Sequence, residues 1–113
     1  MSEYLQVQTT TDSREDANRL ARGVVEARLA ACVQTVGPVT STYWWEEQVQ
    51  QDEEFLLLMK IDADRYDDLA EYLTENHSYA VPELIAISIV EGGADYLSWI
   101  SEETQEDHPS RSE

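Results

Sequence analysis

Apolar and polar residues alternate along this chain in patterns that change from strand-like to helix-like and back. Residues 4–10 alternate at every second position, which predicts a strand with one buried face. Residues 13–32 and residues 62–75 then repeat apolar residues every three or four positions, as helices with one apolar side do. Residues 55–59 are apolar throughout, which indicates a central strand that is buried on both faces.

A long hairpin is predicted in the middle of the chain. Residues 39–45 are rich in β-branched and aromatic residues, and residues 49–61 form the returning strand after a polar break at 46–48. Gly37-Pro38 interrupts the extended segment that comes before. Because a proline lacks the N–H that a central strand needs, this dipeptide predicts a bulge or an edge strand.

A last strand and a short helix follow the second predicted helix. Pro82 marks the entry to an apolar strand at residues 84–90, and Gly92-Gly93 ends that strand. Residues 94–100 then have the pattern of a short amphipathic helix.

The order of the elements is β-α-β-β-α-β with a C-terminal helix, which predicts an α+β, ferredoxin-like fold with an antiparallel sheet. We expect one domain over residues 1–101 and a disordered acidic tail over residues 102–113, which offers no apolar side chain to bury. Both main helices should cover the same face of the sheet. Because the third strand is apolar on both sides, we expect other copies of the chain to cover the opposite face, in a homo-oligomer.

The charge of the chain narrows the choice of partners. Its 113 residues carry 24 acidic and seven basic side chains, a formal net charge of −17, which would repel nucleic acids and anionic membranes. The acidity can attract cations, or it can serve solubility in a salty cytoplasm, which is the commoner role of acidic runs. A single cysteine, the absence of an apolar span of membrane length and the absence of an export signal predict a cytoplasmic protein.

The sequence contains no motif that is typical of an enzyme active site. The glycines do not form a phosphate-binding loop, and no serine or cysteine has an obvious helper on a nearby element. We therefore predict a protein that is not an enzyme and that requires no cofactor.

The connection at residues 76–83 holds the densest set of chemical groups. His77 follows a predicted helix end, where an imidazole can cap the helix or bind copper or zinc, and the cap is the favoured interpretation. Glu83 precedes a buried strand, so we expect its carboxylate to pair with Lys60 at the end of the central strand or with a backbone donor. Cys32 is interpreted first as a small buried apolar residue.

The aromatic residues of the hairpin alternate between the two faces of the sheet. Tyr43 and Trp45 share one face and Trp44 takes the other, so one face can serve an interface while the other lines a cleft.

Together these residues resemble the CutA family of divalent-cation tolerance proteins over residues 9–100. The segments that carry the resemblance are Ala27-Arg28-Leu29-Ala30-Ala31-Cys32, Ser41-Thr42-Tyr43-Trp44-Trp45-Glu46, Leu58-Met59-Lys60, His77-Ser78-Tyr79-Ala80-Val81-Pro82-Glu83 and Asp95-Tyr96-Leu97-Ser98-Trp99-Ile100. Each segment alone is a weak signal, but their common order and spacing make a strong one.

The resemblance implies a tight homotrimer of ferredoxin-like protomers, similar in shape to the PII signalling proteins, with long hairpins that link neighbours. It also implies a role in the tolerance of copper and other divalent cations in the bacterial cytoplasm, and no reaction. Some members of the family have cysteine or histidine where this chain has Thr9 and Asn76. Of that ligand set only His77 is present, so a copper site would be weak unless three copies of the chain converge or Glu83 or Cys32 joins it.

Two hypotheses for the function follow, and a third is more general. The first is a trimeric, cytoplasmic, non-catalytic binding or signalling protein of divalent-cation tolerance, whose inter-subunit cleft is lined by Tyr43, Trp45, Lys60, His77, Glu83 and Tyr96 of a neighbour. The second makes the cleft a PII-like sensor of a small anionic metabolite, in which Lys60 meets the anion and the hairpin aromatic residues meet an apolar group. The third is a structural scaffold that docks a partner protein.

Overall fold

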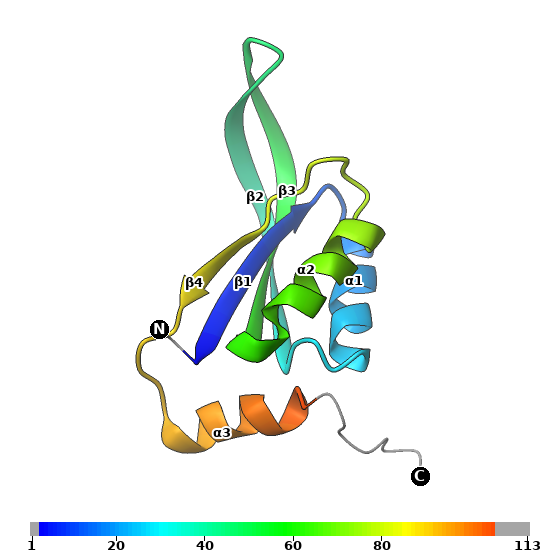
Figure 1. The fold of residues 1–113 in the computed structure, drawn as a ribbon. Coiled ribbons are helices and arrows are strands. Elements are labelled where there is room, and N and C mark those ends of the chain that lie inside the picture. The colour runs from blue at the N-terminus through cyan, green and yellow to red at the C-terminus, as the bar shows by residue number, and fades with distance from the viewer. Residues whose placement is uncertain (1–2, 106–113) are drawn as a thin grey trace.

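Figure 1 shows a four-stranded antiparallel sheet with two helices against one face and a third helix beside the strand ends. The computed structural model describes residues 3–105. Its elements are β1 (Tyr4–Thr11), α1 (Arg14–Glu26), β2 (Cys32–Trp45), β3 (Gln48–Asp62), a short 3₁₀ turn η1 (Ala63–Arg65), α2 (Tyr66–Asn76), β4 (Ile85–Ser88) and α3 (Ala94–Glu103). The strand order is β2-β3-β1-β4. This arrangement confirms the predicted ferredoxin-like α+β fold.

The core lies between the sheet and the helices α1 and α2. Alternate residues of the two central strands point into it, because side chains along a strand face opposite sides in turn. The residues of this covered face and its helices are 0–1% exposed, and they include Val7, Leu57, Met59, Ile61, Leu20, Val24, Leu69 and Leu73.

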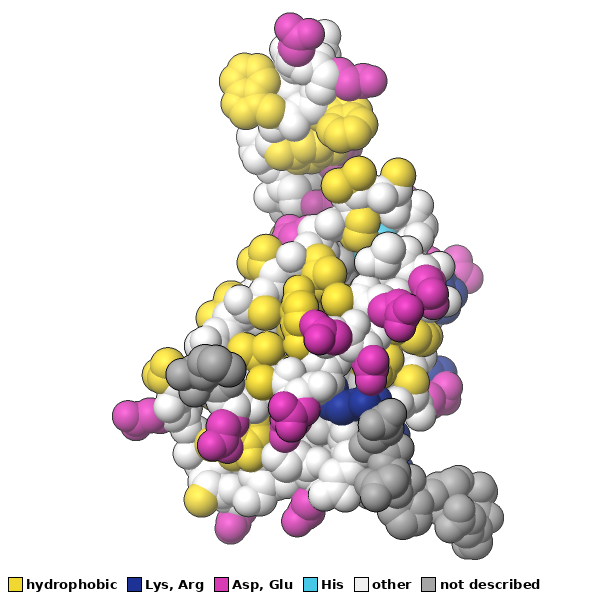
Figure 2. Space-filling model, viewed as in Figure 1, with side chains coloured by type: hydrophobic (Ala, Val, Ile, Leu, Met, Phe, Trp, Pro, Cys, Tyr) yellow, Lys and Arg dark blue, Asp and Glu magenta, His cyan; other side chains and the backbone are white. Residues whose placement is uncertain are grey.

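Within residues 3–105 no helix covers most of the opposite face of the sheet, and we call it the open face. Leu56 and Leu58 lie on this face, since they alternate with the buried Leu57. Cross-strand pairing brings Val36 beside Leu56, and β4 adds Ile85 and Ile87 to the same face. Val36, Ile85 and Ile87 are 44%, 46% and 47% exposed. Hydrophobic side chains are visible near β4 and along the hairpin (Figure 2).

Helix α1 ends earlier than its apolar pattern predicts. The pattern suggested an end near Cys32, but the helix stops at Glu26 and Arg28 adopts the left-handed region with φ of 63°. The N–H of Leu29 then donates to the carbonyl of Val24, which closes the helix in a Schellman motif. No glycine marks this stop, so the buried Leu29 and Ala30 extended the apparent pattern.

The hairpin of β2 and β3 is long, as predicted. The register shifts between Val36 and Val39, which confirms the bulge expected at Gly37-Pro38 on an edge strand. Beyond this point the two strands pair only with each other and project from the rest of the sheet (Figure 1). Glu46 and Glu47 form the tip, and both have positive φ values of 51° and 63°.

The C-terminal part departs from the prediction in its boundaries. Strand β4 covers Ile85–Ser88 and is shorter than predicted, while α3 continues through Glu103. Thr104 is 1% exposed and donates to the carbonyl of Ile100, so the folded domain extends past the predicted boundary at residue 101. Residues 106–113 of the predicted tail lie outside the described residues. Within residues 3–105 no helix is both long enough and apolar enough to cross a membrane.

Candidate functional site

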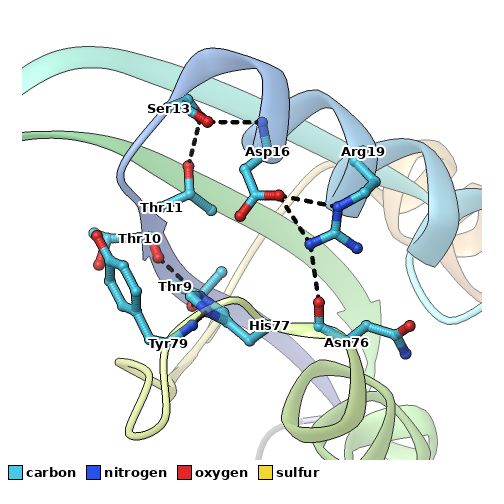
Figure 3. Close-up of polar contacts among 9 residues, drawn as sticks. All are labelled: Thr9, Thr10, Thr11, Ser13, Asp16, Arg19, Asn76, His77 and Tyr79. Atoms are coloured by element: carbon cyan, nitrogen blue, oxygen red, sulfur yellow. Dashed lines mark hydrogen bonds and ion pairs between the residues drawn. The ribbon is translucent and has the colours of Figure 1, made fainter.

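His77 joins the end of α2 to the first strand. Its backbone N–H donates to the carbonyl of Leu73, which makes it the C-cap residue of α2. The imidazole turns away from the helix carbonyls: Nε2 lies 2.8 Å from the carbonyl oxygen of Thr10 and 3.1 Å from Oγ1 of Thr9. On the other side of the ring, Nδ1 accepts the backbone N–H of Tyr79 at 3.0 Å. The side chain therefore fixes the start of the 77–84 connection against β1 (Figure 3).

These contacts define the tautomer of the imidazole. A backbone carbonyl only accepts hydrogen bonds, so Nε2 carries the proton that points at Thr10. Nδ1 uses its lone pair to accept the N–H of Tyr79. A metal ion binds an imidazole through a free nitrogen lone pair, and in this arrangement His77 has none to offer. The geometry thus favours a positioning role for His77.

A second polar group on α1 holds the same connection. The Asp16 carboxylate lies 2.9 Å from an Arg19 nitrogen, and another hydrogen bond of that guanidinium reaches the carbonyl of Asn76 at 2.9 Å (Figure 3). A hydrogen bond from Ser78 and the Arg19 guanidinium lower the pKa of Asp16. The Asp16 N–H also donates to Ser13 Oγ at the start of α1, and the sequence gave no signal for the contacts with residues 76–78.

Tyr79 extends the connection to the base of the hairpin. Its hydroxyl donates to the Glu54 carboxylate at 2.7 Å. Burial and the neighbouring Glu54 carboxylate raise the pKa of Tyr79 well above its ordinary value. A second phenol repeats this pairing further out, where the Tyr43 hydroxyl donates to Asp52 and the bond raises the pKa of Tyr43. Neither tyrosine was predicted to bind a carboxylate.

Lys60 and Glu83 do not form the predicted pair. The Lys60 ammonium donates to Oε1 of Gln34 at 2.6 Å, across the β2–β3 pairing. Glu83 is exposed, and the salt bridges of the described residues do not include it. The predicted pair does not form because the side-chain amide of Gln34, on the neighbouring strand, binds the Lys60 ammonium instead.

Cys32 and Tyr96 meet at one end of the open face. Cys32 stands directly opposite Lys60 on the neighbouring strand and is partly buried. Burial and the adjacent Cys32 side chain, to which its hydroxyl is hydrogen-bonded, raise the pKa of Tyr96. Tyr96 thus contacts a residue of its own chain, and its predicted place in the cleft of a neighbour stays a prediction.

The hairpin aromatic residues alternate as predicted. Tyr43 and Trp45 pair with Gln50 and Gln48, and Trp44 pairs with the intervening Val49 on the opposite side. Trp44 is 73% exposed and Trp45 56% exposed in the single chain.

The residues proposed as metal ligands lie in different surroundings. His77 binds β1, Glu83 is exposed on the connection, and Cys32 contacts Tyr96 at the far end of the open face. Among residues 3–105 no group of three or more His, Cys, Asp or Glu side chains is placed to hold a metal ion.

The fold defines a ferredoxin-like protein in which apolar side chains on one face of the sheet, such as Val36, Ile85 and Ile87, are exposed in the single chain. Comparison with known proteins assigns the family. The chain belongs to the CutA1 divalent ion tolerance protein family, whose model matches residues 5–103. This confirms the resemblance stated from the sequence. The family is named for divalent ion tolerance and not for a reaction.

Individual relatives agree in sequence and in structure. A divalent-cation tolerance protein CutA of Thermus thermophilus is 43% identical over 84% of this chain and 92% of its own length. Protein CutA 1, chloroplastic, of Oryza sativa is 42% identical over 88% of this chain and 56% of its own length, so the chain spans about half of that relative. The crystal structure of CutA1 from Oryza sativa superposes with a TM-score of 0.89 at 40% identity, covering 92% of this chain and 95% of that chain.

Proposed function

We propose that the chain is a non-catalytic binding or signalling protein of divalent-cation tolerance that acts as a homotrimer in the cytoplasm. The observation that carries the proposal is the open face, where Ile85 and Ile87 remain 46% and 47% exposed in the single chain. Apolar patches of this kind mark interfaces, because leaving them in water costs free energy. A second and third copy, brought together with their hairpins, supply a cover of matching chemistry.

The assembly can be tested on the intact protein. An Ile87→Asp variant introduces a charge into the open face, and we expect it to reduce the molar mass measured by light scattering from that of a trimer to that of a monomer. Val90→Asp is the matched control, because Val90 is 85% exposed outside the strands. A trimer that survives Ile87→Asp, or a wild-type chain that is monomeric, would contradict the proposal.

The ligand cleft of this proposal lies between copies. Tyr43, Trp45 and Lys60 would line it, with Tyr96 and Glu83 at its borders, and His77 would support it from behind by fixing the 77–84 connection. Such a cleft needs no cofactor bound within one chain.

Divalent cations such as Cu²⁺ would bind weakly in this proposal, through the acidic surface and the subunit borders rather than through His77. The support is the imidazole itself, whose two nitrogens are engaged with Thr10 and Tyr79. Titration calorimetry with copper should give the same weak affinity for wild type and His77→Ala, while Glu83→Gln and Cys32→Ser test the other two ligand candidates. A clear loss of copper affinity in His77→Ala would overturn this assignment.

A second candidate function is a sensor of a small anionic metabolite in the same cleft. Lys60 favours it, because it is the one basic residue within the described strands and is oriented by Gln34 at 2.6 Å. Thermal scanning against a panel of phosphorylated and carboxylated metabolites would detect such binding. A shift that persists in a metal chelator and disappears in Lys60→Gln would favour the sensor over the cation-binding protein.

A further inference from the structure

The end of α1 has an unusual residue for its backbone conformation. The position after a helix C-cap that turns left-handed is commonly glycine, because a Cβ atom is crowded there. Arg28 occupies this position with φ of 63°. A residue that retains a disfavoured backbone conformation directs attention to its side chain.

The Arg28 side chain binds the last turn of α3. Its Nη1 lies 2.6 Å from Oε1 of Glu103 and 3.3 Å from the Glu103 carbonyl oxygen. The two side chains are 23% and 29% exposed, so the pair is shielded from solvent more than surface pairs are. A cation at the C-terminus of a helix also meets the negative end of its dipole. The carbonyl of Arg28 in turn accepts Nε of Arg65 at 3.4 Å, which holds the loop in place.

Polar contacts fix the remainder of α3 to the strand ends. Ser101 lies 2.8 Å from the Tyr4 hydroxyl and donates to Asp62 at 3.0 Å, and Tyr96 reaches Cys32. Ile100 is the one fully buried apolar side chain of the described helix α3.

A groove separates α3 from the end of α1. Its volume is about 450 Å³, and Val25, Ala30, Ala31 and Trp99 form its apolar walls between Glu26 and the Arg28–Glu103 pair. Helix α3 is therefore held by polar contacts at both ends and by one apolar anchor, with open space behind it.

We propose that α3 is a lid over the end of the open face that carries Cys32 and Lys60, and that the Arg28–Glu103 ion pair is its latch. The latch accounts for an arginine at a position that suits glycine. When the pair separates, α3 moves away from the end of α1 as one rigid helix, so that Tyr96 in its first turn also leaves Cys32. The lid borders the proposed ligand cleft, but its test uses no ligand, so its failure would leave the proposed function standing.

The thiol of Cys32 reports on the lid. We would measure the rate at which a thiol reagent labels Cys32 in the intact, native protein, because local opening of α3 uncovers more of this partly buried side chain and speeds labelling. Glu103→Gln removes the charge of the latch and should accelerate labelling about fivefold, in keeping with the strength of a partly shielded ion pair. Glu102→Gln removes an equal charge from an exposed neighbour and should leave the rate unchanged.

A second variant separates the latch from backbone strain. Arg28→Gly removes the guanidinium but suits the left-handed backbone, so it should accelerate labelling as Glu103→Gln does while retaining the stability of the whole domain. Hydrogen exchange of the α3 amides, measured on the same variants, should increase together with labelling.

Equal labelling and exchange in Glu103→Gln and Glu102→Gln would overturn the lid. A thiol that stays unreactive in every variant would also count against it, as would an acceleration that only follows a loss of global stability in denaturant.

Discussion

The two faces of the sheet are built from the same strands but differ in how deeply their side chains are buried. On the covered face Leu57 and Met59 are 0% exposed beneath α1 and α2. On the open face their immediate neighbours Leu56 and Leu58 are only partly buried. Strand β3 thus contributes fully buried side chains to the core on one side and partly exposed side chains to the open face on the other.

This difference in burial suggests separate roles for the two faces in folding and in association. The covered face can stabilise a single protomer, because its apolar side chains are already removed from water. In the proposed trimer, the open face would gain further stabilisation when another copy covers it. Folding of the protomer should therefore depend on the first face, and association on the second.

The largest expected loss of stability comes from a substitution on the covered face. Leu57→Ala should lower the free energy of unfolding by about 3 kcal/mol, because it leaves a cavity in a packed core. Leu58→Ala should cost about 1 kcal/mol or less in dilute protein, where its side chain is partly in water. Urea denaturation over a range of protein concentrations measures both.

Protein concentration is the control for this comparison. The deficit of Leu58→Ala should increase with concentration, since association stabilises only the folded form. The deficit of Leu57→Ala should be similar throughout. Equal losses for the two variants in the most dilute sample would refute the distinction between the faces.

The next largest effect on stability concerns the hydrogen bonds of His77, which join the end of α2 to β1. His77→Ala removes the bonds to Thr10 and Tyr79 and leaves part-buried backbone groups unsatisfied, so it should cost about 2 kcal/mol. Thr74→Ala is the control at the same helix end, because Thr74 is exposed and bonds only to Ala70. If His77→Ala lowers the free energy of unfolding by less than Thr74→Ala does, the hydrogen bonds of the imidazole do not stabilise the fold.

The sequence predicted the fold well because the fold follows from local periodicity. The alternation in β1 and the apolar run at residues 55–59 directly reflect the pleat of a sheet with one and two buried faces. The end of α1 was mispredicted because its stop depends on a left-handed arginine, which no local pattern announces.

The site was less predictable because its contacts are long-range. His77 binds residues 67 and 68 positions away, and Arg19 reaches Asn76 across 57 positions. Sequence spacing carries no information on such pairs. The same limit produced the false Lys60–Glu83 pair, since Gln34 approaches Lys60 only after β2 and β3 align.

A smaller effect should appear at acidic pH. The folded-state pKa of Asp16 lies below its ordinary value of 3.8 because of Ser78 and Arg19, so its stabilisation is full above that value and is lost as the pH falls through the folded pKa. Asp16→Asn should cost about 1 kcal/mol at pH 7 and less near pH 3. Denaturation at the two pH values measures the difference, and a gap that widens on acidification would contradict the assigned sign.

The smallest expected effect lies at the hairpin tip, which belongs neither to the covered face nor to the open face. Glu46 and Glu47 both occupy the left-handed region, as a tight hairpin turn requires, and Asn-Gly suits that turn better. Glu46→Asn with Glu47→Gly should stabilise the hairpin by about 0.5–1 kcal/mol. Hydrogen exchange of the hairpin amides and global denaturation measure where the gain appears.

The charge-matched control for the tip is Glu46→Gln with Glu47→Gln, which removes the same charges and retains the strained turn. A gain in this control as large as in the Asn-Gly variant would assign the effect to charge repulsion. If the gain of the Asn-Gly variant is confined to the hairpin amides, the hairpin opens independently of the covered core. If it also appears in global unfolding, the hairpin is coupled to the rest of the fold, as it would be when its aromatic residues contribute to the surface that covers a neighbour's open face.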